Sequence, residues 1–259
     1  MKLVGRKIHG GKAEGEAIVL DEPFGFLGGV EQATGRLLTH KEGNIAGKVF
    51  VFPSGKGSTV GSFVMYDLHV KGKGPAAVVN ETAETIVTTG AVISSTPMVD
   101  SIDVSLIRDG DLVRVDADAG AVELPNVREI HAVSSVVDVG DGFIMLKRPS
   151  DAKSYPGRWS LCAGKIERGE RPADAAVREI KEELDIDVGE PASSLEPIMV
   201  REKDRIWVVY PFLFEAPGAV PKLNGENRAW RKSTVEDLDP RELVEKTAEA
   251  VRELYARKG

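Results

Sequence analysis

The sequence has little cysteine, no excess of positive charge and no long apolar run. Its single cysteine, Cys162, excludes an internal disulfide framework. It also excludes an iron–sulfur cluster held by this chain alone, because such clusters usually need three or four cysteines. With a net charge of −7, the chain is not expected to have nucleic acid as a partner.

Membrane and export signals are missing as well. No apolar run reaches the length of a membrane span, and the opening stretch MKLVGRKIHGGK has no signal-peptide core. Apolar residues still make up 42% of the chain, which is enough for sizeable cores, and 259 residues fit two average domains. We therefore expect a soluble, cytoplasmic protein with no membrane partner.

The first half of the chain is typical of a β-rich domain. The β-branched runs EAIVL, KVFVF, AAVVN and AVISS are bounded by turn-forming residues, and GDLVRVDADAGAVEL predicts a hairpin. Helical stretches are scarce, and TAETIVTTG is the clearest. The break at LPNVREI predicts a boundary, so we expect one domain over residues 1–125 and a second over residues 131–259.

The second half mixes strands with helices. HAVSSVVDV and GFIMLKRP predict two strands about a GDG turn, and EPIMVREKDRIWVVYPFLFE predicts a hairpin that turns at EKDR. Helices are expected from about Pro172 to Asp185 and from about Pro240 to Ala256. This mixture predicts a three-layer α/β sandwich.

The strongest functional signal is the stretch GKIERGERPADAAVREIKEELDI, residues 164–186. At 3.6 residues per turn, Glu179, Glu182 and Glu183 share one face of the predicted helix, beside an apolar stripe. Like charges at this spacing repel each other, and a bound divalent cation would remove that repulsion. Oxygen-only ligands favour Mg²⁺ or Mn²⁺ over zinc. The alternative interpretation is a solvated acidic face.

The spacing in this stretch resembles the Nudix box, G-x5-E-x7-R-E-U-x-E-E-x-G-U, in which U is an apolar residue. Gly164 opens the pattern, and Glu170 and Arg178 follow at the required intervals. One position departs, because Asp185 stands where the family has its last glycine. That position ends the helix with a positive φ, which Asp tolerates better than most residues, so the departure bears on helix termination more than on metal binding.

The resemblance implies an α/β/α Nudix sandwich that hydrolyses a diphosphate linkage. Glu179, Glu182 and Glu183 are implied to bind the metal, with Glu182 as our candidate for orienting or deprotonating water. Glu170 is implied to be a supporting or additional metal-binding carboxylate, and Arg178 to hold a glutamate by a bidentate contact. Isomerases share this fold, but the intact Arg-Glu-x-x-Glu-Glu pattern favours hydrolysis.

A glycine-rich loop, PSGKGSTVGS, follows the predicted strand KVFVF. The loop contains Gly55, Lys56, Gly57, Ser58 and Thr59. It is not a Walker loop, because a glycine follows the lysine where that motif needs Ser or Thr. Such a loop can direct several backbone N–H groups at one anion, and a plain tight turn is the alternative.

The first half as a whole resembles the small subunit of the aconitase X family, which in archaea is a phosphomevalonate dehydratase subunit. The resemblance runs through GRKIHGGKAEGEAIVL, PFGFLGGV, GNIAGKVFVFPSGKGSTVGSFVMYDL and GPAAVVNETAETIVTTGAVISSTPMVD. It implies the aconitase swivel fold, a β/β/α barrel-like unit. The glycine-rich loop would then belong to a dehydratase and not to a nucleotide site.

The same resemblance implies a reaction and a partner. Water would be removed from 5-phosphomevalonate to give trans-anhydromevalonate 5-phosphate, with Ser58 as the proton acceptor. The substrate would be bound by Gly55, Lys56, Gly57 and Thr59. The leaving hydroxyl needs a Lewis acid, which the resemblance assigns to an iron–sulfur cluster on a separate large subunit, in agreement with the single cysteine here.

These resemblances together predict a fusion of a dehydratase small subunit, acting in an archaeal-type mevalonate route, with a Nudix domain. The chain is expected to act on small phosphate and diphosphate compounds. The alternative is a Nudix hydrolase whose first half is a non-catalytic docking module.

Overall fold

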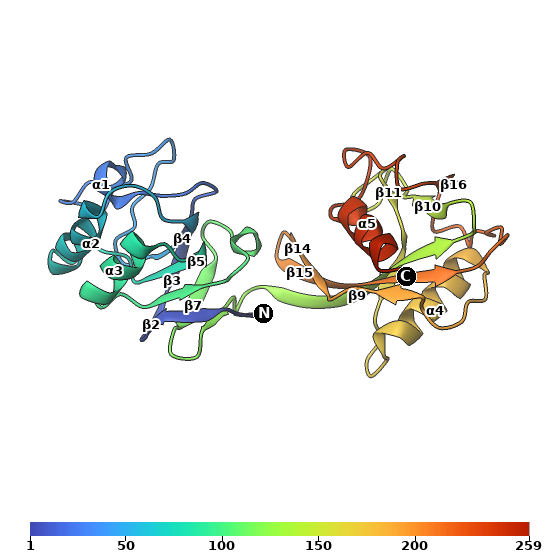
Figure 1. Cartoon of the computed structure of the whole chain (residues 1–259), viewed down its shortest axis with the longest axis horizontal. Coiled ribbons are helices and arrows are strands. Elements are labelled where there is room, and N and C mark those ends of the chain that lie inside the picture. Colours follow the sequence, from blue (N-terminus) through green and yellow to red (C-terminus); the bar gives the residue numbers. More distant parts are fainter. Residues whose placement is uncertain (259) are drawn as a thin grey trace. The chain divides into compact units, whose positions relative to one another are not determined.

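The computed structural model describes residues 1–258, which form two compact units. The first unit is Met1–Arg128 and the second begins at Glu129. Each unit contains an eight-stranded sheet (Figure 1). Among the described residues, no helix combines the length and the apolar character needed to cross a membrane.

The first unit is built on a mixed sheet with the order β1-β8-β7-β3-β4-β5-β6-β2. Its strands are β1 (Lys2–Val4), β2 (Arg6–His9), β3 (Lys12–Val19), β4 (Val49–Ser54), β5 (Ala77–Thr82), β6 (Met98–Asp100), β7 (Leu112–Asp116) and β8 (Ala121–Glu123). The central strands β3 to β6 are parallel, and antiparallel strands flank them on both sides. The β-rich character and the β7–β8 hairpin expected from the sequence are confirmed.

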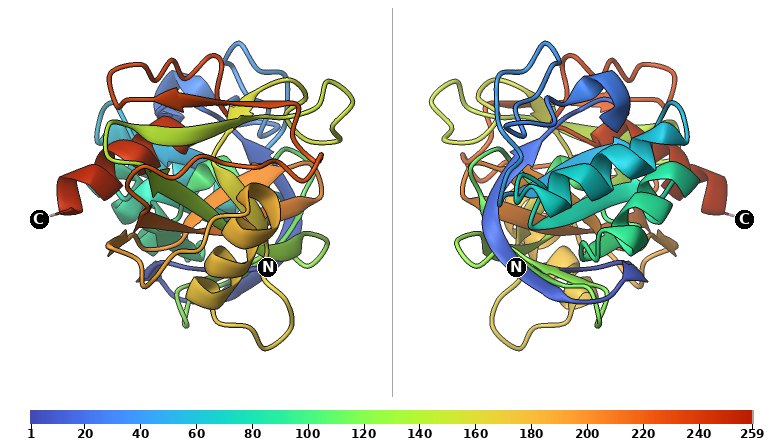
Figure 2. Two further views of the ribbon diagram at one scale, coloured as in Figure 1. Left: turned by 90° about the vertical axis from the view of Figure 1, so that its right-hand side faces the viewer. Right: turned by 90° about the vertical axis from the view of Figure 1, so that its left-hand side faces the viewer.

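Helices cover one face of this sheet. They are α1 (Phe26–Gly29), α2 (Val60–Val70) and α3 (Thr85–Ile93), with a 3₁₀ turn η1 (Val104–Leu106). Figure 2 (right) shows α2 and α3 side by side over the strands. Phe50 and Phe52 of β4 are fully buried and share a core with Val64 of α2 and Val87 of α3. Val49 and Val51, which point to the other face of β4, are also fully buried, which explains why the strand is apolar at successive positions.

Two expectations for this unit are wrong. The run AVISS is not β structure, because its first three residues form the last turn of α3. Ser94 then closes the helix with a bond from its Oγ to the carbonyl oxygen of Gly90 at 2.6 Å. Helix α2 was not expected at all, since apolar side chains lie on both its buried and its exposed faces and hide the helical period. Packing against the sheet determines the helical conformation of both segments.

The second unit has the strand order β11-β10-β9-β15-β13, while β12 pairs with β9, β14 with β15 and β16 with β10. Its strands are β9 (Arg128–Asp138), β10 (Phe143–Lys147), β11 (Trp159–Ser160), β12 (Cys162–Lys165), β13 (Ser193–Ser194), β14 (Ile198–Glu202), β15 (Arg205–Glu215) and β16 (Ala229–Ser233). The two strands expected about the GDG turn are confirmed as β9 and β10, and the expected hairpin is confirmed as β14–β15.

Two helices enclose this sheet, α4 (Pro172–Leu184) and α5 (Thr247–Arg257). Successive residues of a strand point to opposite faces. Accordingly Val133 and Val137 of β9 pack in the core that contains α4, whereas Val136 packs in the core that contains α5. Figure 1 shows α4 (gold) and α5 (red) on opposite sides of the sheet. The expected three-layer sandwich is therefore confirmed.

The last helix is shorter than the sequence predicted. It begins at Thr247 and not near Pro240. Leu243 is buried, as its place in the apolar stripe indicated, but it pairs with Trp159 in a β-bridge. Lys246 then takes a left-handed conformation with φ of 63°, which cannot belong to an α-helix. The chain therefore packs against β11 before it becomes helical.

Candidate functional sites

Helix α4 has sharply defined ends. Proline in its first turn supplies a φ that already suits a helix. The negative charge of Asp174 in the same turn interacts favourably with the positive end of the helix dipole. The helix ends at Asp185, which has φ of 55° and ψ of 34° and whose N–H donates to the carbonyl oxygen of Lys181 at 3.0 Å. The positive φ expected for the residue in the family's glycine position is confirmed.

The carboxylate face of α4 is turned toward the protein. Glu183 is only 7% exposed and the side chain of Glu179 only 14%, whereas the side chain of Glu182 is 55% exposed. Gly164 of β12 lies directly against the carboxylate of Glu179, and a Cβ there would come within 1.8 Å of the carboxyl carbon. A solvated acidic face therefore does not describe Glu179 and Glu183.

Arg178 donates hydrogen bonds to three of the four predicted carboxylates. Its guanidinium donates to both oxygens of Glu170, from Nε at 2.9 Å and from Nη2 at 3.1 Å. Nη1 donates to Glu179 at 2.8 Å and to Glu182 at 3.2 Å. Nη2 also donates to the carbonyl oxygen of Lys165 at 3.0 Å. The bidentate contact expected of Arg178 is present in this structure and is made to Glu170.

The electrostatics of the cluster follow from burial and like charge. Burial, together with the charges of Glu179 and Glu226, raises the pKa of Glu183 to about 7, although a hydrogen bond from Cys162 opposes the shift. Burial also raises the pKa of Glu179, although Arg178 opposes that change. Close to Arg178, by contrast, the hydrogen bond from the guanidinium lowers the pKa of Glu170. Of the two inner carboxylates, Glu179 is thus paired with Arg178, whereas burial and like charge dominate at Glu183.

A hard divalent cation fits this donor set. Within residues 1–258, no three His, Cys, Asp or Glu side chains are arranged as a ready metal centre. However, the donors are all carboxylate oxygens, which Mg²⁺ and Mn²⁺ accept. Oε2 of Glu183 is buried and has no hydrogen-bond partner among the described residues. An unpaired buried carboxylate oxygen is costly, and a cation beside it would remove that cost.

One acidic residue of this cluster was missed by the sequence analysis. Glu226 lies in the loop before β16, and its charge acts on both Glu179 and Glu183. No periodicity connects it to α4, because the two segments are far apart in the chain. The fold brings Glu226 close to Glu179 and Glu183. The only related signal in the sequence is the surplus of acidic residues in this half.

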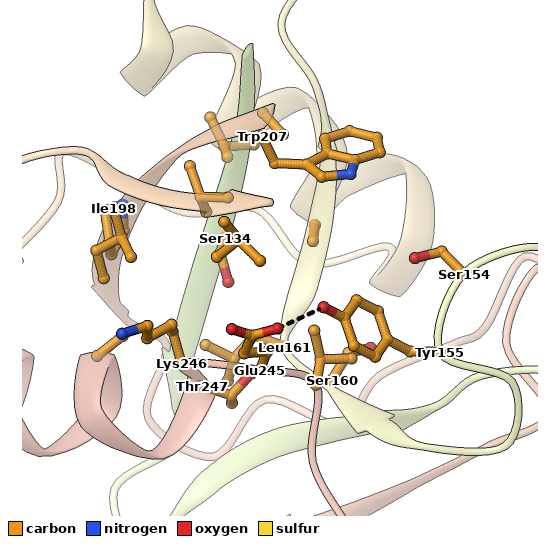
Figure 3. A pocket seen from close by; sticks show the side chains of 18 of the residues that line it. Ser134, Ser154, Tyr155, Ser160, Leu161, Ile198, Trp207, Glu245, Lys246 and Thr247 are labelled. Carbon is orange, nitrogen blue, oxygen red and sulfur yellow. Dashed lines mark hydrogen bonds between the residues drawn. The ribbon is translucent and has the colours of Figure 1, made fainter. Parts of the chain in front are cut away.

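A cavity of about 320 Å³ lies in the second unit, and its lining residues include none from α4. Gly164 and Lys165 of β12 line it, and both also contact residues of α4. Tyr155, Trp207 and Glu245 also line the cavity (Figure 3). The hydroxyl of Tyr155 donates to Oε2 of Glu245 at 3.1 Å. The sequence analysis did not single out these three side chains, which come from separate segments.

The glycine-rich loop of the first unit connects β4 to α2, so its five predicted residues lie together at one helix N-terminus. Backbone pairing extends from β4 into the loop, because the N–H of Lys56 donates to the carbonyl oxygen of Phe24 at 3.0 Å. Gly55 has no room for a side chain, since a Cβ would meet Val87 at 2.6 Å. Gly57 needs its φ of 109°. The steric limit at Gly55 and the positive φ of Gly57 thus define the conformation of the loop.

Ser58 closes this loop at the start of α2 and is exposed. Its Oγ accepts a long bond from the N–H of Val60 at 3.4 Å, and its carbonyl oxygen accepts from the N–H of Gly61 at 2.8 Å. The first N–H groups of a helix have no acceptor within the helix, and the helix dipole adds partial positive charge there. The loop can therefore stabilise an anion near Ser58.

Comparison with known proteins assigns a family to each unit. The family model of the aconitase X swivel domain matches residues 2–124, and that of the NUDIX domain matches residues 129–256. The phosphomevalonate dehydratase small subunit of Thermococcus kodakarensis is 57% identical over 129 residues, covering 48% of this chain and 96% of that protein. The same subunit of Methanocella arvoryzae is 47% identical over 131 residues, covering 48% and 99%.

Solved structures resemble the two units separately. The crystal structure of Thermococcus kodakaraensis aconitase X in its holo form is 55% identical with a TM-score of 0.47, and the match covers 48% of this chain and 98% of that one. The MutT protein of Methanosarcina mazei Go1 is 19% identical with a TM-score of 0.43, covering 50% and 95%.

Proposed function

Since the chain belongs to the family of phosphomevalonate dehydratase small subunits over its first unit and is a NUDIX domain over its second, we propose that it serves two reactions. The first unit is the small subunit of a phosphomevalonate dehydratase of the mevalonate pathway. The observation that supports this role is the 57% identity to such a subunit over 96% of its length. The second unit hydrolyses a diphosphate linkage.

In the dehydration, Ser58 removes the proton from C2 of 5-phosphomevalonate. The electrons of that C–H bond form the C2–C3 double bond as the bond from C3 to its hydroxyl breaks. A serine is a weak base, and the positive end of α2 with the N–H groups of Gly57 and Thr59 lowers the energy of its alkoxide. Lys56 and Gly55 complete the binding site for the substrate anion. An iron–sulfur cluster on a large subunit supplies the Lewis acid for the leaving hydroxyl.

The exposed face of α2 supports the existence of that large subunit. Val60, Phe63, Tyr66 and Val70 recur three or four residues apart, and Phe63 and Val70 are 67% and 65% exposed. They lie opposite the buried residues of the same helix. Contiguous exposed apolar side chains mark interaction surfaces. Because α2 begins two residues after Ser58, a large subunit seated on this face would lie close to the substrate-binding loop.

Reconstitution tests this proposal. The purified chain alone is expected to show neither dehydration nor iron–sulfur absorbance, and a complex with a large subunit of the same family is expected to dehydrate 5-phosphomevalonate. Phe63→Ser is expected to weaken assembly at least tenfold, whereas the control Leu38→Ser, also at an exposed apolar residue, leaves it unchanged. A complex that assembles but never dehydrates would make the first unit a docking module.

In the hydrolysis, the second unit uses the carboxylates of α4. Glu179, Glu182 and Glu183 hold Mg²⁺ or Mn²⁺, which neutralises charge on the diphosphate oxygens when it is bound. Glu182, the most exposed of the three, orients and deprotonates the attacking water. Arg178 fixes Glu170 and Glu179 through the contacts described above. The observation that supports this role is the carboxylate cluster of α4, in which Glu183 is buried and Arg178 pairs with Glu170 and Glu179.

A hydrolysis screen tests the second activity. The compounds are ADP-ribose, nucleoside di- and triphosphates and isopentenyl diphosphate, each with and without Mg²⁺ or Mn²⁺. Glu182→Gln keeps the side-chain volume and removes one charge, so turnover is expected to fall about a hundredfold while the chain stays folded. Glu190→Gln, at another exposed glutamate of this unit, is the control. Equal turnover in wild type and Glu182→Gln would contradict the role of the cluster.

A further inference from the structure

Strand β12 packs against helix α4. Cys162 and Gly164 are two residues apart on the strand, so both face α4, whereas Leu161 packs in the opposite core, with α5. Glu179 and Glu183 are four residues apart on the helix, so they lie one above the other on the same side. The glycine at position 164 leaves room for the carboxylate of Glu179.

The spacing along the two elements brings Cys162 to Glu183. Two residues of a strand advance by about 6.6 Å and four residues of a helix by about 6 Å. Because Gly164 lies against Glu179, Cys162 lies against Glu183 at the next step. A hydrogen bond joins the thiol of Cys162 to the carboxylate of Glu183. A thiol carries its proton at neutral pH, and a carboxylate that binds a cation has none to donate, so Cys162 is the donor.

Glu183 depends on this donor more than the other carboxylates of the cluster do. Arg178 donates to the other three carboxylates. The N–H of Ala163 also bears on Glu183, but it contributes less than the thiol. Oε2 of Glu183 is buried and has no hydrogen-bond partner within residues 1–258. The thiol therefore holds one side of the carboxylate and leaves Oε2 available to a ligand.

We propose that Cys162 is a positioning residue for the divalent cation of the second unit, because its thiol holds Glu183 in the orientation in which Oε2 faces that cation. The proposal rests on the hydrolase role proposed above for the presence of the cation. Without this bond, the charges of Glu179 and Glu226 push the carboxylate of Glu183 away from them. Loss of a hydrogen bond to a metal-binding side chain typically lowers metal affinity by about 10- to 100-fold.

A cysteine that only fills the core would behave differently. Cys162 is 1% exposed and shares a core with Ile180 and Leu184, and a buried cysteine can act simply as a small apolar residue. In that case Ala and Val would replace it without loss of metal affinity, and Ser would be the disruptive substitution. A positioning donor predicts the reverse order, because Ser keeps an O–H group whereas Ala and Val have no donor.

The test measures metal binding and not turnover. The full chain is titrated with Mn²⁺, and electron paramagnetic resonance follows the free ion. Cys162→Ala and Cys162→Val are expected to bind Mn²⁺ about tenfold more weakly than the wild type, and Cys162→Ser within about threefold of it. Ser135→Ala is the matched control, because Ser135 lies directly opposite Cys162 on β9, is equally buried and has an Oγ without a hydrogen-bond partner within residues 1–258. Its affinity should equal that of the wild type.

The thermal unfolding midpoint without metal shows which variants are folded. Ala leaves a small space and Val slightly overfills it, so one apolar variant remains for the comparison if the other does not fold. The proposal is overturned if a folded Ala or Val variant binds Mn²⁺ as tightly as the wild type, if the Ser variant binds as weakly as they do, or if the wild type binds no Mn²⁺. A wild type that binds Mn²⁺ but hydrolyses nothing would contradict the hydrolase role and leave the role of Cys162 standing.

Discussion

Gly164 and the carboxylate of Glu179 occupy adjoining space, so that a Cβ at position 164 would lie 1.8 Å from the Glu179 carboxyl carbon. The two residues belong to β12 and α4, which pack against each other in the second unit. The glycine that opens the Nudix-box spacing therefore has a steric role. It leaves room for a buried carboxylate.

Gly164→Ala is expected to displace Glu179 and to reduce diphosphate hydrolysis at least tenfold. The clash is with the end of a flexible side chain, so the fold is expected to survive with a similar thermal unfolding midpoint. Gly189→Ala is the matched control, because a Cβ there meets nothing within 4 Å. Initial rates at saturating Mg²⁺ or Mn²⁺ measure the effect. Unchanged hydrolysis in Gly164→Ala would show that Glu179 is not needed where the structure places it.

Glu226→Gln is expected to weaken Mn²⁺ binding about tenfold. Glu226 adds negative charge beside Glu179 and Glu183, and removing that charge lowers the attraction for a divalent cation. The measurement is a Mn²⁺ titration followed by electron paramagnetic resonance, with Glu236→Gln, an exposed residue after β16, as the control. If the two variants bind Mn²⁺ with equal affinity, Glu226 does not contribute to the metal site.

Ser58→Ala in the reconstituted dehydratase is expected to lower turnover at least a thousandfold without preventing assembly. The hydroxyl is exposed and makes only a long bond to the N–H of Val60, so its loss should barely affect stability. Thr89→Ala, which removes an exposed hydroxyl from α3, is the control. Turnover of the Ser58 variant near that of the wild type would reject Ser58 as the proton acceptor.

Asp100→Asn is expected to destabilise the first unit by about 2 kcal/mol at pH 7, the size of a charge-assisted hydrogen-bond pair. Asp100 accepts from Nε and Nη2 of Arg6 at 3.0 and 2.6 Å and from the N–H of Ala83 at 3.1 Å. Burial raises the pKa of Asp100, but these bonds and the charge of Arg6 outweigh it and lower the pKa overall.

The pH dependence of that effect has a defined direction. Because the pKa of Asp100 is lower in the folded chain than in the unfolded one, its contribution is complete above about pH 4 and is lost as the pH falls through the folded pKa. The difference between wild type and Asp100→Asn should therefore shrink in acid. Circular dichroism of urea unfolding measures it. The fluorescence of the three tryptophans, all in the second unit, is the internal control. A difference that grows in acid would contradict the assignment.

The sequence by itself determined the features that depend on neighbours in the chain. The positions of Glu179, Glu182 and Glu183 on one side of α4 follow from 3.6 residues per turn, and the end of that helix at Asp185 follows from local backbone preference. The β-strands around short turns were also predictable, since alternation and turn residues are local signals. These interactions form within a single element, so one stretch of sequence contains all their partners.

Only the tertiary structure decided the features that join distant segments. The contact between Gly164 and Glu179, the approach of Glu226 and the pairing of Tyr155 with Glu245 each unite residues from separate elements. Helix α2 likewise forms because the sheet buries one side of it. No spacing rule relates such residues, because strand pairing and layer packing bring them together. Their proximity, and with it the shape of both candidate sites, exists only once the cores have formed.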